Sequence, residues 1–275
     1  MSEKKCNKSG CTAEDCKNCA HNQNREENIS FENCNNIKNV IGIVSGKGGV
    51  GKSTVTALIA RKLANAGYKV GILDGDITGP SIPKMFGLSG TVEVSNYGME
   101  PAVSTEGIKV ISMNLLLDNE EDPVVFRGPI LASAINQFWN EVNWGELDYL
   151  LVDMPPGTGD VPLTVYQSLP VTGIVIVTSP QELVQMIVMK AYNMAEKMNV
   201  PVLGLVENYS YFECPDCNKR YNIFGTSHIE EMASDLGTEI IAKLPIIPEA
   251  ARMADDGVDG FDAIEVNLEP IIKAD

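Results

Sequence analysis

The sequence predicts an α/β fold built on a doubly wound, mostly parallel sheet. Apolar runs of strand length alternate along the chain with segments of helical period, which is the order produced by right-handed β-α-β units. Most of these runs are near-continuous Val, Ile and Leu, typical of strands buried on both faces of a parallel sheet. The first run leads directly into a glycine-rich loop that opens a helical segment.

The apolar runs give the expected strands, and the segments between them give the expected helices. The strands are Val40–Ser45, Lys69–Leu73, Lys109–Met113, Tyr149–Asp153, Gly173–Thr178, Val202–Val206 and Glu239–Leu244. The helices are Lys52–Ala66, Pro129–Glu141, Val161–Gln167, Gln181–Met198 and Ser227–Leu236. Two longer parts, Gly75–Gly107 and Asn208–Gly225, are expected to be irregular and follow strand ends, where ligands bind in open α/β sheets.

Composition restricts the class of protein. The 275 residues are 44% hydrophobic, which is enough for one core, and the net charge of −16 disfavours nucleic acid or anionic lipid as a partner. Residues 1–36 are polar and cysteine-bearing, and we expect them to form a flexible tail before a single domain at 37–275. The chain shows no secretory signal and no apolar run of membrane-spanning length, so we expect a cytoplasmic protein with reduced thiols.

The glycine-rich loop has the pattern of a phosphate cradle. Its candidate nucleotide-binding residues are Gly46, Lys47, Gly48, Gly49, Val50, Gly51, Lys52, Ser53 and Thr54. Glycines let successive backbone N–H groups turn towards phosphate oxygens, and the helix that follows adds its positive end. Lys52 is placed to reach the outer phosphates and Ser53 to hold Mg²⁺. ATP and Mg²⁺ are the cofactors this pattern predicts.

Carboxylates at two strand ends complete the expected NTPase site. Asp153 follows four apolar residues and has the form of a carboxylate that holds Mg²⁺ through a water. Asp76 is our candidate for orienting the attacking water, whereas Asp74 is expected to be structural. The alternative is that such aspartates only cap turns.

Lys47 is a second lysine, placed early in the loop. One interpretation is a solvated loop lysine. The other is a cation delivered across a dimer interface to the phosphates of a partner, similar in effect to an arginine finger.

The cysteines are segregated in the sequence, which suggests metal ligation. Cys214 and Cys217 form a C-x-x-C pair in the body, whereas Cys16 and Cys19 form the tightest pair of the tail. Four thiolates complete a zinc or iron–sulfur site, so one body pair is half a site that a symmetric dimer would complete. A thioredoxin-like redox pair and a zinc site shared with the tail are the alternatives.

Together these stretches resemble known families. Gly46–Thr54 resembles the deviant phosphate loop of the MinD and nitrogenase iron-protein class. Further stretches resemble the Mrp/ApbC family of iron–sulfur carrier P-loop ATPases over about residues 38 to 260, and they are Asp74–Ser81, Arg127–Pro129, Trp144–Asp148, Asp153–Asp160, Val206–Ser210 and the Cys214/Cys217 pair.

The resemblance implies a homodimer that bridges a labile 4Fe–4S cluster between Cys214 and Cys217 of both subunits. It also implies ATP binding and slow hydrolysis, coupled to cluster loading from donors or transfer to apo iron–sulfur proteins. By the same resemblance, Lys47 is the signature lysine, and Asp76 and Asp153 are switch carboxylates. Asn208 falls where relatives contact adenine, and an amide can pair with that base. The tail resembles that of the eukaryotic scaffold members but differs from it in cysteine spacing.

Two other functions remain open at the level of sequence. A spatial-positioning ATPase of the ParA/MinD kind would need a basic surface or an amphipathic C-terminal helix, and Asp255–Asp275 is acidic with Lys273 as its one basic residue. In a zinc-stabilised nucleotide switch, the Cys214 pair would be purely structural.

Overall fold

The computed structural model describes residues 35–76, 79, 81–95, 98–117, 128–157, 160–181, 183–247 and 264–273, with the backbone alone for 128–131, 160–161 and 183–185. The expectations for the cysteines of the tail therefore lie outside the described residues, and the first strand already begins at Asn36. Arg127 and part of the stretch after Asp153 lie outside them as well.

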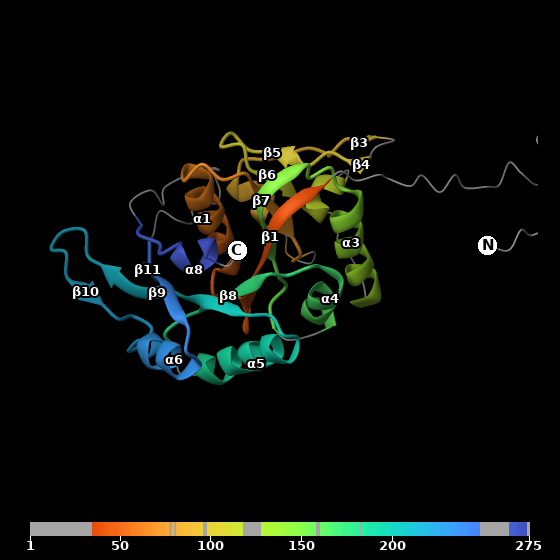
Figure 1. Cartoon of the computed structure of the whole chain (residues 1–275). Helices are drawn as coiled ribbons and strands as arrows, with labels where there is room; N and C mark the ends of the chain where they lie inside the picture. Colours follow the sequence, from red (N-terminus) through yellow and green to blue (C-terminus); the bar gives the residue numbers. More distant parts are fainter. Residues whose placement is uncertain are drawn as a thin grey trace, which may run out of the picture. The chain divides into compact units, whose positions relative to one another are not determined.

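Nine strands of the described chain form one sheet (Figure 1). Its order is β10-β9-β8-β1-β7-β2-β6-β5, and β11 pairs with β9. Neighbours run parallel except for β10 on β9 and β5 on β6. The strands are β1 (Asn36–Ser45), β2 (Val70–Asp74), β5 (Ala102–Val103), β6 (Lys109–Ile111), β7 (Glu146–Asp153), β8 (Gly173–Thr178), β9 (Val202–Glu213), β10 (Arg220–Tyr221) and β11 (Glu239–Pro245).

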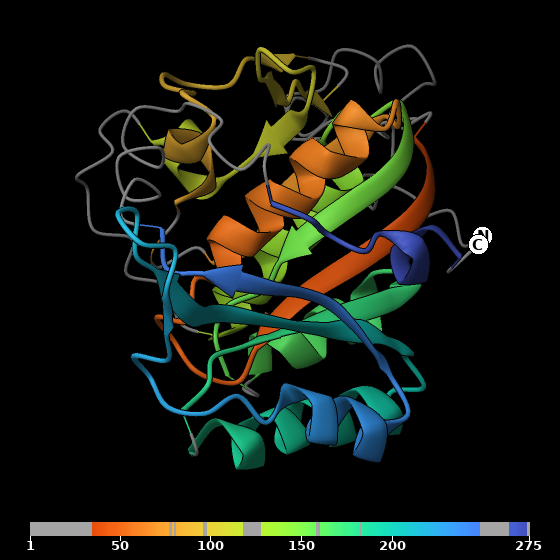
Figure 2. The same cartoon turned by 90° about the vertical axis from the view of Figure 1, so that its left-hand side faces the viewer.

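Helices cover both faces of this sheet (Figure 2). One face carries α1 (Lys52–Asn65), α2 (Ile82–Met85) and α8 (Glu269–Ile272). The other carries α3 (Gly128–Glu141), α4 (Asp160–Ser168), α5 (Leu183–Lys197) and α6 (Ile229–Leu236). The short 3-10 helix η1 (Met113–Leu116) follows β6, and β3 (Val94–Ser95) pairs with β4 (Gly98–Met99) apart from the main sheet.

The two faces explain the continuous apolar runs. In β1, Ile41 and Ile43 are buried in the cluster that contains α1, whereas Val40 and Val44 are buried in the cluster that contains α3 to α6. A strand with alternate side chains in two cores needs apolar residues at every position. The predicted doubly wound, mostly parallel α/β fold is confirmed, and β8 covers the predicted Gly173–Thr178 without change.

Four expectations about individual elements were wrong. The strand predicted at Val202–Val206 continues to Glu213, because β11 and β10 give its later residues hydrogen-bonding partners. Asn208–Gly225 is therefore strand and hairpin over much of its length. The strand predicted at Lys109–Met113 stops at Ile111, where η1 takes over. Gly75–Gly107 contains α2, β3, β4 and β5, which are too short to leave a periodic pattern.

No helix among the described residues is both long and apolar enough to cross a membrane.

Candidate functional site

The glycine-rich loop emerges from the middle of the sheet, between β1 and α1. The parallel register aligns Ile43 with Asp153 of β7, and Ser45 with Val177 of β8. The loop therefore lies at the edge where these strands end. α1 begins at Lys52. The loop borders a cavity of about 270 Å³, to which Asp76 and Tyr209 also contribute.

Two of the loop glycines are required by close contacts. A Cβ on Gly46 would overlap the side chain of Ile187 in α5, so the start of the loop packs directly against that helix. Gly51 has a left-handed φ of 78°, and a Cβ there would collide with the amide of Asn208. Glycine is the residue that tolerates both conditions. The loop shape is thus determined by backbone packing against α5 and β9.

Asp153 is the centre of the buried polar cluster beneath this cavity. Its carboxylate is fully buried and accepts hydrogen bonds from Ser53 Oγ at 2.6 Å and Thr56 Oγ1 at 2.7 Å. Lys52 Nζ lies 2.7 Å from Asp153 Oδ1. The structure therefore brings together the predicted phosphate lysine, the predicted Mg²⁺ serine and the predicted Mg²⁺ carboxylate. Thr56 was missed, because it lies outside the loop motif.

Several buried polar atoms near the cavity lack a hydrogen-bond partner. The ion pair of Lys52 with Asp153 is short, but its angle does not make a hydrogen bond, so the donors of Lys52 Nζ remain unused. Ser45 Oγ and Thr178 Oγ1, at the ends of β1 and β8, are also without partners among the described residues. Buried polar groups are normally paired, so such atoms indicate a polar ligand. A phosphate group at the cradle supplies the acceptors that Lys52 lacks.

Asp74 is the second buried carboxylate of the cluster. It is aligned with Asp153 on the neighbouring strand and accepts a hydrogen bond from Ser112 Oγ at 3.1 Å. Burial raises the pKa of Asp74 to about 8, and the negative charge of Asp153 acts in the same direction. At neutral pH this carboxyl is therefore largely protonated, which limits the negative charge beside Lys52.

Asp76 lies two residues further along and lines the cavity itself. It is half-buried, and its backbone N–H donates to Asp74 Oδ1 at 3.2 Å. Asp76, the candidate for orienting the attacking water, thus lies at the cavity wall, and Asp74 lies behind that wall.

Lys47 is exposed, and its ammonium donates to Gln181 Oε1 at 2.8 Å. Gln181 lies just before α5, across the loop from α1. The contact joins two solvated side chains, and such contacts contribute little to stability. The lysine is therefore readily released towards another acceptor.

Asn208 and Tyr209 approach the cradle from β9. Asn208 is buried and its Nδ2 donates to Val50 O at 2.9 Å, while its Oδ1 accepts from Tyr209 N–H at 2.9 Å. Tyr209 has a left-handed φ of 58°. Its hydroxyl lies 3.1 Å from the position that a Cβ on Gly51 would occupy. Tyr209 was missed as a site residue, because tyrosine as a residue type carries no signal for this backbone conformation.

Cys214 and Cys217 form the tip of the hairpin between β9 and β10, which lies at the edge of the sheet (Figure 1). Backbone hydrogen bonds from Cys214 N to Lys219 O at 3.0 Å and from Asn218 N to Cys214 O at 2.8 Å close the turn. Cys217 is exposed and Cys214 half-buried, and both are free thiols. The pair therefore projects from the sheet, where a second molecule can reach it.

The two thiols by themselves supply two ligands, whereas a tetrahedral metal site needs four. Within the described residues, no group of three or more His, Cys, Asp and Glu side chains is placed to hold a metal ion. The backbone N–H of Asp216 lowers the pKa of the Cys214 thiol, and the N–H and thiol of Cys217 add to this. A lowered pKa favours the thiolate, which is the form that binds soft metals.

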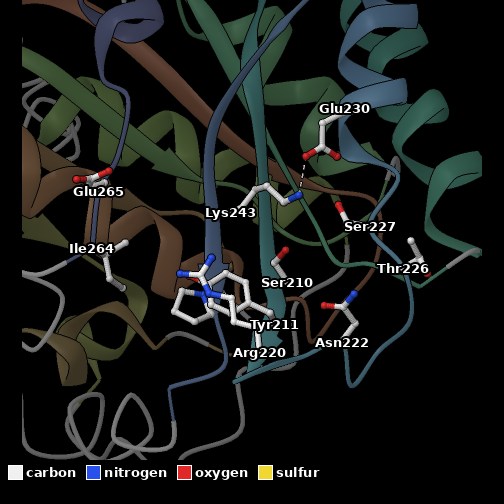
Figure 3. Close-up of a pocket in the computed structure, with 11 residues that line it drawn as sticks. Ser210, Tyr211, Arg220, Asn222, Thr226, Ser227, Glu230, Lys243, Ile264 and Glu265 are labelled. Atoms are coloured by element: carbon white, nitrogen blue, oxygen red, sulfur yellow. Dashed lines mark hydrogen bonds and ion pairs between the residues drawn. The ribbon is translucent and has the colours of Figure 1, made fainter. Parts of the chain in front are cut away.

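A second cavity, of about 780 Å³, lies beside the hairpin (Figure 3). The Arg220 guanidinium stacks 4.4 Å from the centre of the Tyr211 ring and pairs with Glu213 at 2.7 Å. On the opposite wall, Lys243 Nζ pairs with Glu230 at 2.6 Å (Figure 3). Both cations are neutralised within the chain, so the cavity has no net attraction for an anion.

The sheet order and the loop between β1 and α1 define the class: this is a P-loop NTPase. The family follows from comparison with known proteins. A family model described as ParA, NUBPL iron-transfer P-loop NTPase, matches residues 36–270, and the chain belongs to this family.

Named relatives and solved structures agree with this assignment. An iron-sulfur cluster carrier protein of Clostridium perfringens is 50% identical over 233 residues, which are 82% of this chain and 82% of the relative. One from Methanocaldococcus jannaschii is 48% identical over 229 residues, 82% of this chain and 79% of the relative. A nucleotide-binding protein from Archaeoglobus fulgidus, solved in complex with ADP, has a TM-score of 0.73 at 47% identity, covering 83% of this chain and 92% of that one.

The cell-division protein MinD shares the fold. MinD in a MinC:MinD complex from Aquifex aeolicus has a TM-score of 0.56 at 23% identity, with 80% of this chain and 86% of that chain covered. At this identity the likeness concerns the fold alone, so it transfers no positioning function to this chain.

Proposed function

We propose that this protein is an ATP-dependent iron–sulfur cluster carrier. It holds a labile 4Fe–4S cluster between Cys214 and Cys217 of two copies and passes the cluster to apo-proteins. The observation that carries the proposal is the pair of free thiols at the tip of a projecting hairpin, half of a four-thiolate site. An exposed, incomplete site suits a cargo that must enter and leave.

Relatives support the nature of the cargo. Both the Clostridium perfringens and the Methanocaldococcus jannaschii relatives are named iron-sulfur cluster carrier proteins. In this proposal the partners of the chain are a second copy, cluster donors and apo iron–sulfur proteins. Reduced thiols are required, which places the carrier in the cytoplasm.

The nucleotide site provides the gate in this proposal. ATP binds with its phosphates in the loop, where the unused donors of Lys52 Nζ form hydrogen bonds with the outer phosphates. Mg²⁺ fits the oxygen donors of Ser53 and, through a water, of Asp153. Asp76 orients the attacking water from the cavity wall. Asn208 is the residue that the family resemblance assigns to adenine, and in this structure its amide is bonded to Val50 O and to the Tyr209 N–H.

Lys47 belongs to the partner's site in this proposal. Its exposure and its weak contact with Gln181 support a role outside its own cavity. In the dimer it neutralises the charge that develops on the partner's phosphates during hydrolysis. The tail pair Cys16 and Cys19 is kept as a candidate second set of ligands.

The test replaces both body cysteines in the full chain. Cys214→Ala with Cys217→Ala is expected to remove the brown colour gained on anaerobic reconstitution with iron and sulfide, because all four thiolates of the shared site, two from each copy, disappear. ATP affinity should stay within about twofold, since neither thiol lines the nucleotide cavity. Absorbance and calorimetric ATP titration provide the measurements.

The matched control is Cys16→Ala with Cys19→Ala, which removes the same number of thiols from the tail. This control should keep the body cluster. An iron content that loss of the body pair leaves unchanged would contradict the proposed site, and zinc in place of iron in anaerobically purified protein would favour a structural role for the pair.

A further inference from the structure

Strand β9 connects the two halves of the proposed function. Asn208, in the middle of the strand, donates to Val50 O in the phosphate loop, and Cys214 follows the end of the same strand. Asn208 and Cys214 are six positions apart in the sequence, so one strand connects the phosphate loop with the thiol hairpin. Pairing with β11 at Tyr211 and with β10 at Phe212 and Glu213 holds the later part of this strand.

Tyr209 contacts both the nucleotide cavity and the segment that follows the thiol hairpin. Its hydroxyl borders the nucleotide cavity beside Gly51, and its ring packs against Phe224 with ring centres 6.1 Å apart. Its left-handed backbone, with φ of 58°, is uncommon for a non-glycine residue. Such a conformation persists where surrounding contacts hold it, here the Asn208 side chain and the aromatic pair.

Phe224 lies in a short span between two fixed points. On one side, β10 pairs Tyr221 with Phe212 of β9. On the other, Ser227 Oγ donates to the buried carboxylate of Glu207 at 3.0 Å, which ties this end back to β9. Phe224 is 41% exposed, and its ring packs against the Tyr209 ring. This contact connects the span that contains Phe224 to β9.

We propose that the Tyr209–Phe224 pair couples occupancy of the nucleotide cavity to the position of the Cys214–Cys217 hairpin. A phosphate that enters the cavity displaces the Tyr209 hydroxyl from beside Gly51. The ring then shifts against Phe224, and the paired hairpin moves with it. Tyr209 is thus a positioning residue, and the coupling deepens the gate named in the proposed function and rests on it.

Coupling between two sites is reciprocal. If nucleotide binding changes the state of the thiols, cluster binding changes the nucleotide affinity by the same factor. An aromatic ring pair contributes more than its buried area alone, so loss of this contact can change the coupling measurably.

The test measures how fast the two thiols react in protein that carries no cluster. Alkylation of Cys214 and Cys217 by iodoacetamide is followed by peptide mass spectrometry in the full-length apo-protein, with and without saturating Mg²⁺ and a non-hydrolysable ATP analogue. In the unmodified chain, the nucleotide should change the alkylation rate about fivefold or more. In Phe224→Ala the change should fall below about twofold, although the variant binds the analogue.

Tyr221→Ala is the matched control. Tyr221 is an aromatic residue of the same hairpin and is 46% exposed. Its ring lies under the Lys219 ammonium, whereas Phe224 packs against Tyr209. The control should keep the nucleotide response. Phe224→Leu replaces the ring at similar apolar volume, and it should also lose the response, which guards against a misfolded alanine variant.

The outcomes separate the coupling from the proposed function. A response that persists in both Phe224 variants, or that is absent from the unmodified chain, overturns the coupling. A chain that takes up no iron but keeps a Phe224-dependent response contradicts the carrier function and leaves the coupling intact. A chain that carries a cluster without any nucleotide response contradicts the coupling alone.

Discussion

At Asp153, three side chains from the loop and α1 meet the end of β7. Lys52, Ser53 and Thr56 all contact its carboxylate, which is itself fully buried. Ser53 and Asp153 could be assigned from the sequence, because the loop motif and an aspartate after an apolar run have recognisable spacing. Thr56 could not, since its bond spans 97 residues and no local pattern marks it.

The Thr56 bond predicts a measurable loss of stability. Thr56→Val removes a hydrogen bond to a buried carboxylate, so the free energy of unfolding should fall by about 2 kcal/mol. Thr172→Val, which removes a bond to the neutral carbonyl of Val40 at 3.1 Å, should cost about 1 kcal/mol. Urea unfolding of the nucleotide-free protein measures both. Equal losses would contradict the extra strength that we assign to the bond with the charged carboxylate.

Asp74 predicts a pH dependence of stability. Its pKa is raised to about 8 in the folded chain from 3.8 in the reference state. Between these values the folded state binds a proton that the unfolded state has lost, so the contribution of this group to stability falls as pH rises, by at most about 1.4 kcal/mol per pH unit. Asp74→Asn should remove that contribution. Urea unfolding from pH 5 to 8 with the same slope in both proteins would contradict the assignment.

Among the elements, β9 departs furthest from expectation. Its apolar run ends near Val206, so the sequence predicts a short strand and an irregular segment after it. The extension to Glu213 depends on pairing with β10 and β11, which are formed by later residues. By contrast, the central strands could be predicted closely, because burial on both faces demands a continuous apolar run. The left-handed backbone of Tyr209 could not be predicted, because the residue type does not indicate that conformation.

The contact between the phosphate loop and α5 gives a test at the same scale. Gly46→Ala should destabilise the protein by about 1–3 kcal/mol, because the added methyl meets Ile187. Gly48→Ala is the matched control, since its added methyl finds its nearest neighbour, Pro156, at 4.0 Å. The combination Gly46→Ala with Ile187→Ala should recover part of the loss. Thermal unfolding measures the stability of each variant. Equal losses of stability in the two single variants would contradict this packing.

The whole molecule combines two incomplete features on one acidic body. In the proposed function, the thiol pair supplies half of the ligands of a shared site, and Lys47, which contacts Gln181 in this structure, acts in the site of the partner. Composition and motifs allow both to be predicted from the sequence, together with the fold. They do not predict where the hairpin projects or what it packs against, because those positions depend on distant pairings such as Tyr209 with Phe224.

Net charge predicts how association responds to salt. Each copy carries −16, so two copies repel one another at low ionic strength. Raising the ionic strength shortens the screening length from about 30 Å at 0.01 M to about 8 Å at 0.15 M. The dimer should therefore become tighter over this range when nucleotide is bound. Sedimentation velocity measures this, and a dimer that weakens with salt would instead indicate an interface held by ion pairs.

The most direct measurement is the iron content of the reconstituted protein together with its mass in solution. The protein is loaded anaerobically with iron and sulfide, and the metal content of each size-resolved species is determined. A four-iron cluster shared by two chains predicts about two iron atoms per chain in a species of twice the chain mass. Iron held by single chains, or a dimer that contains zinc and no iron, would contradict the account.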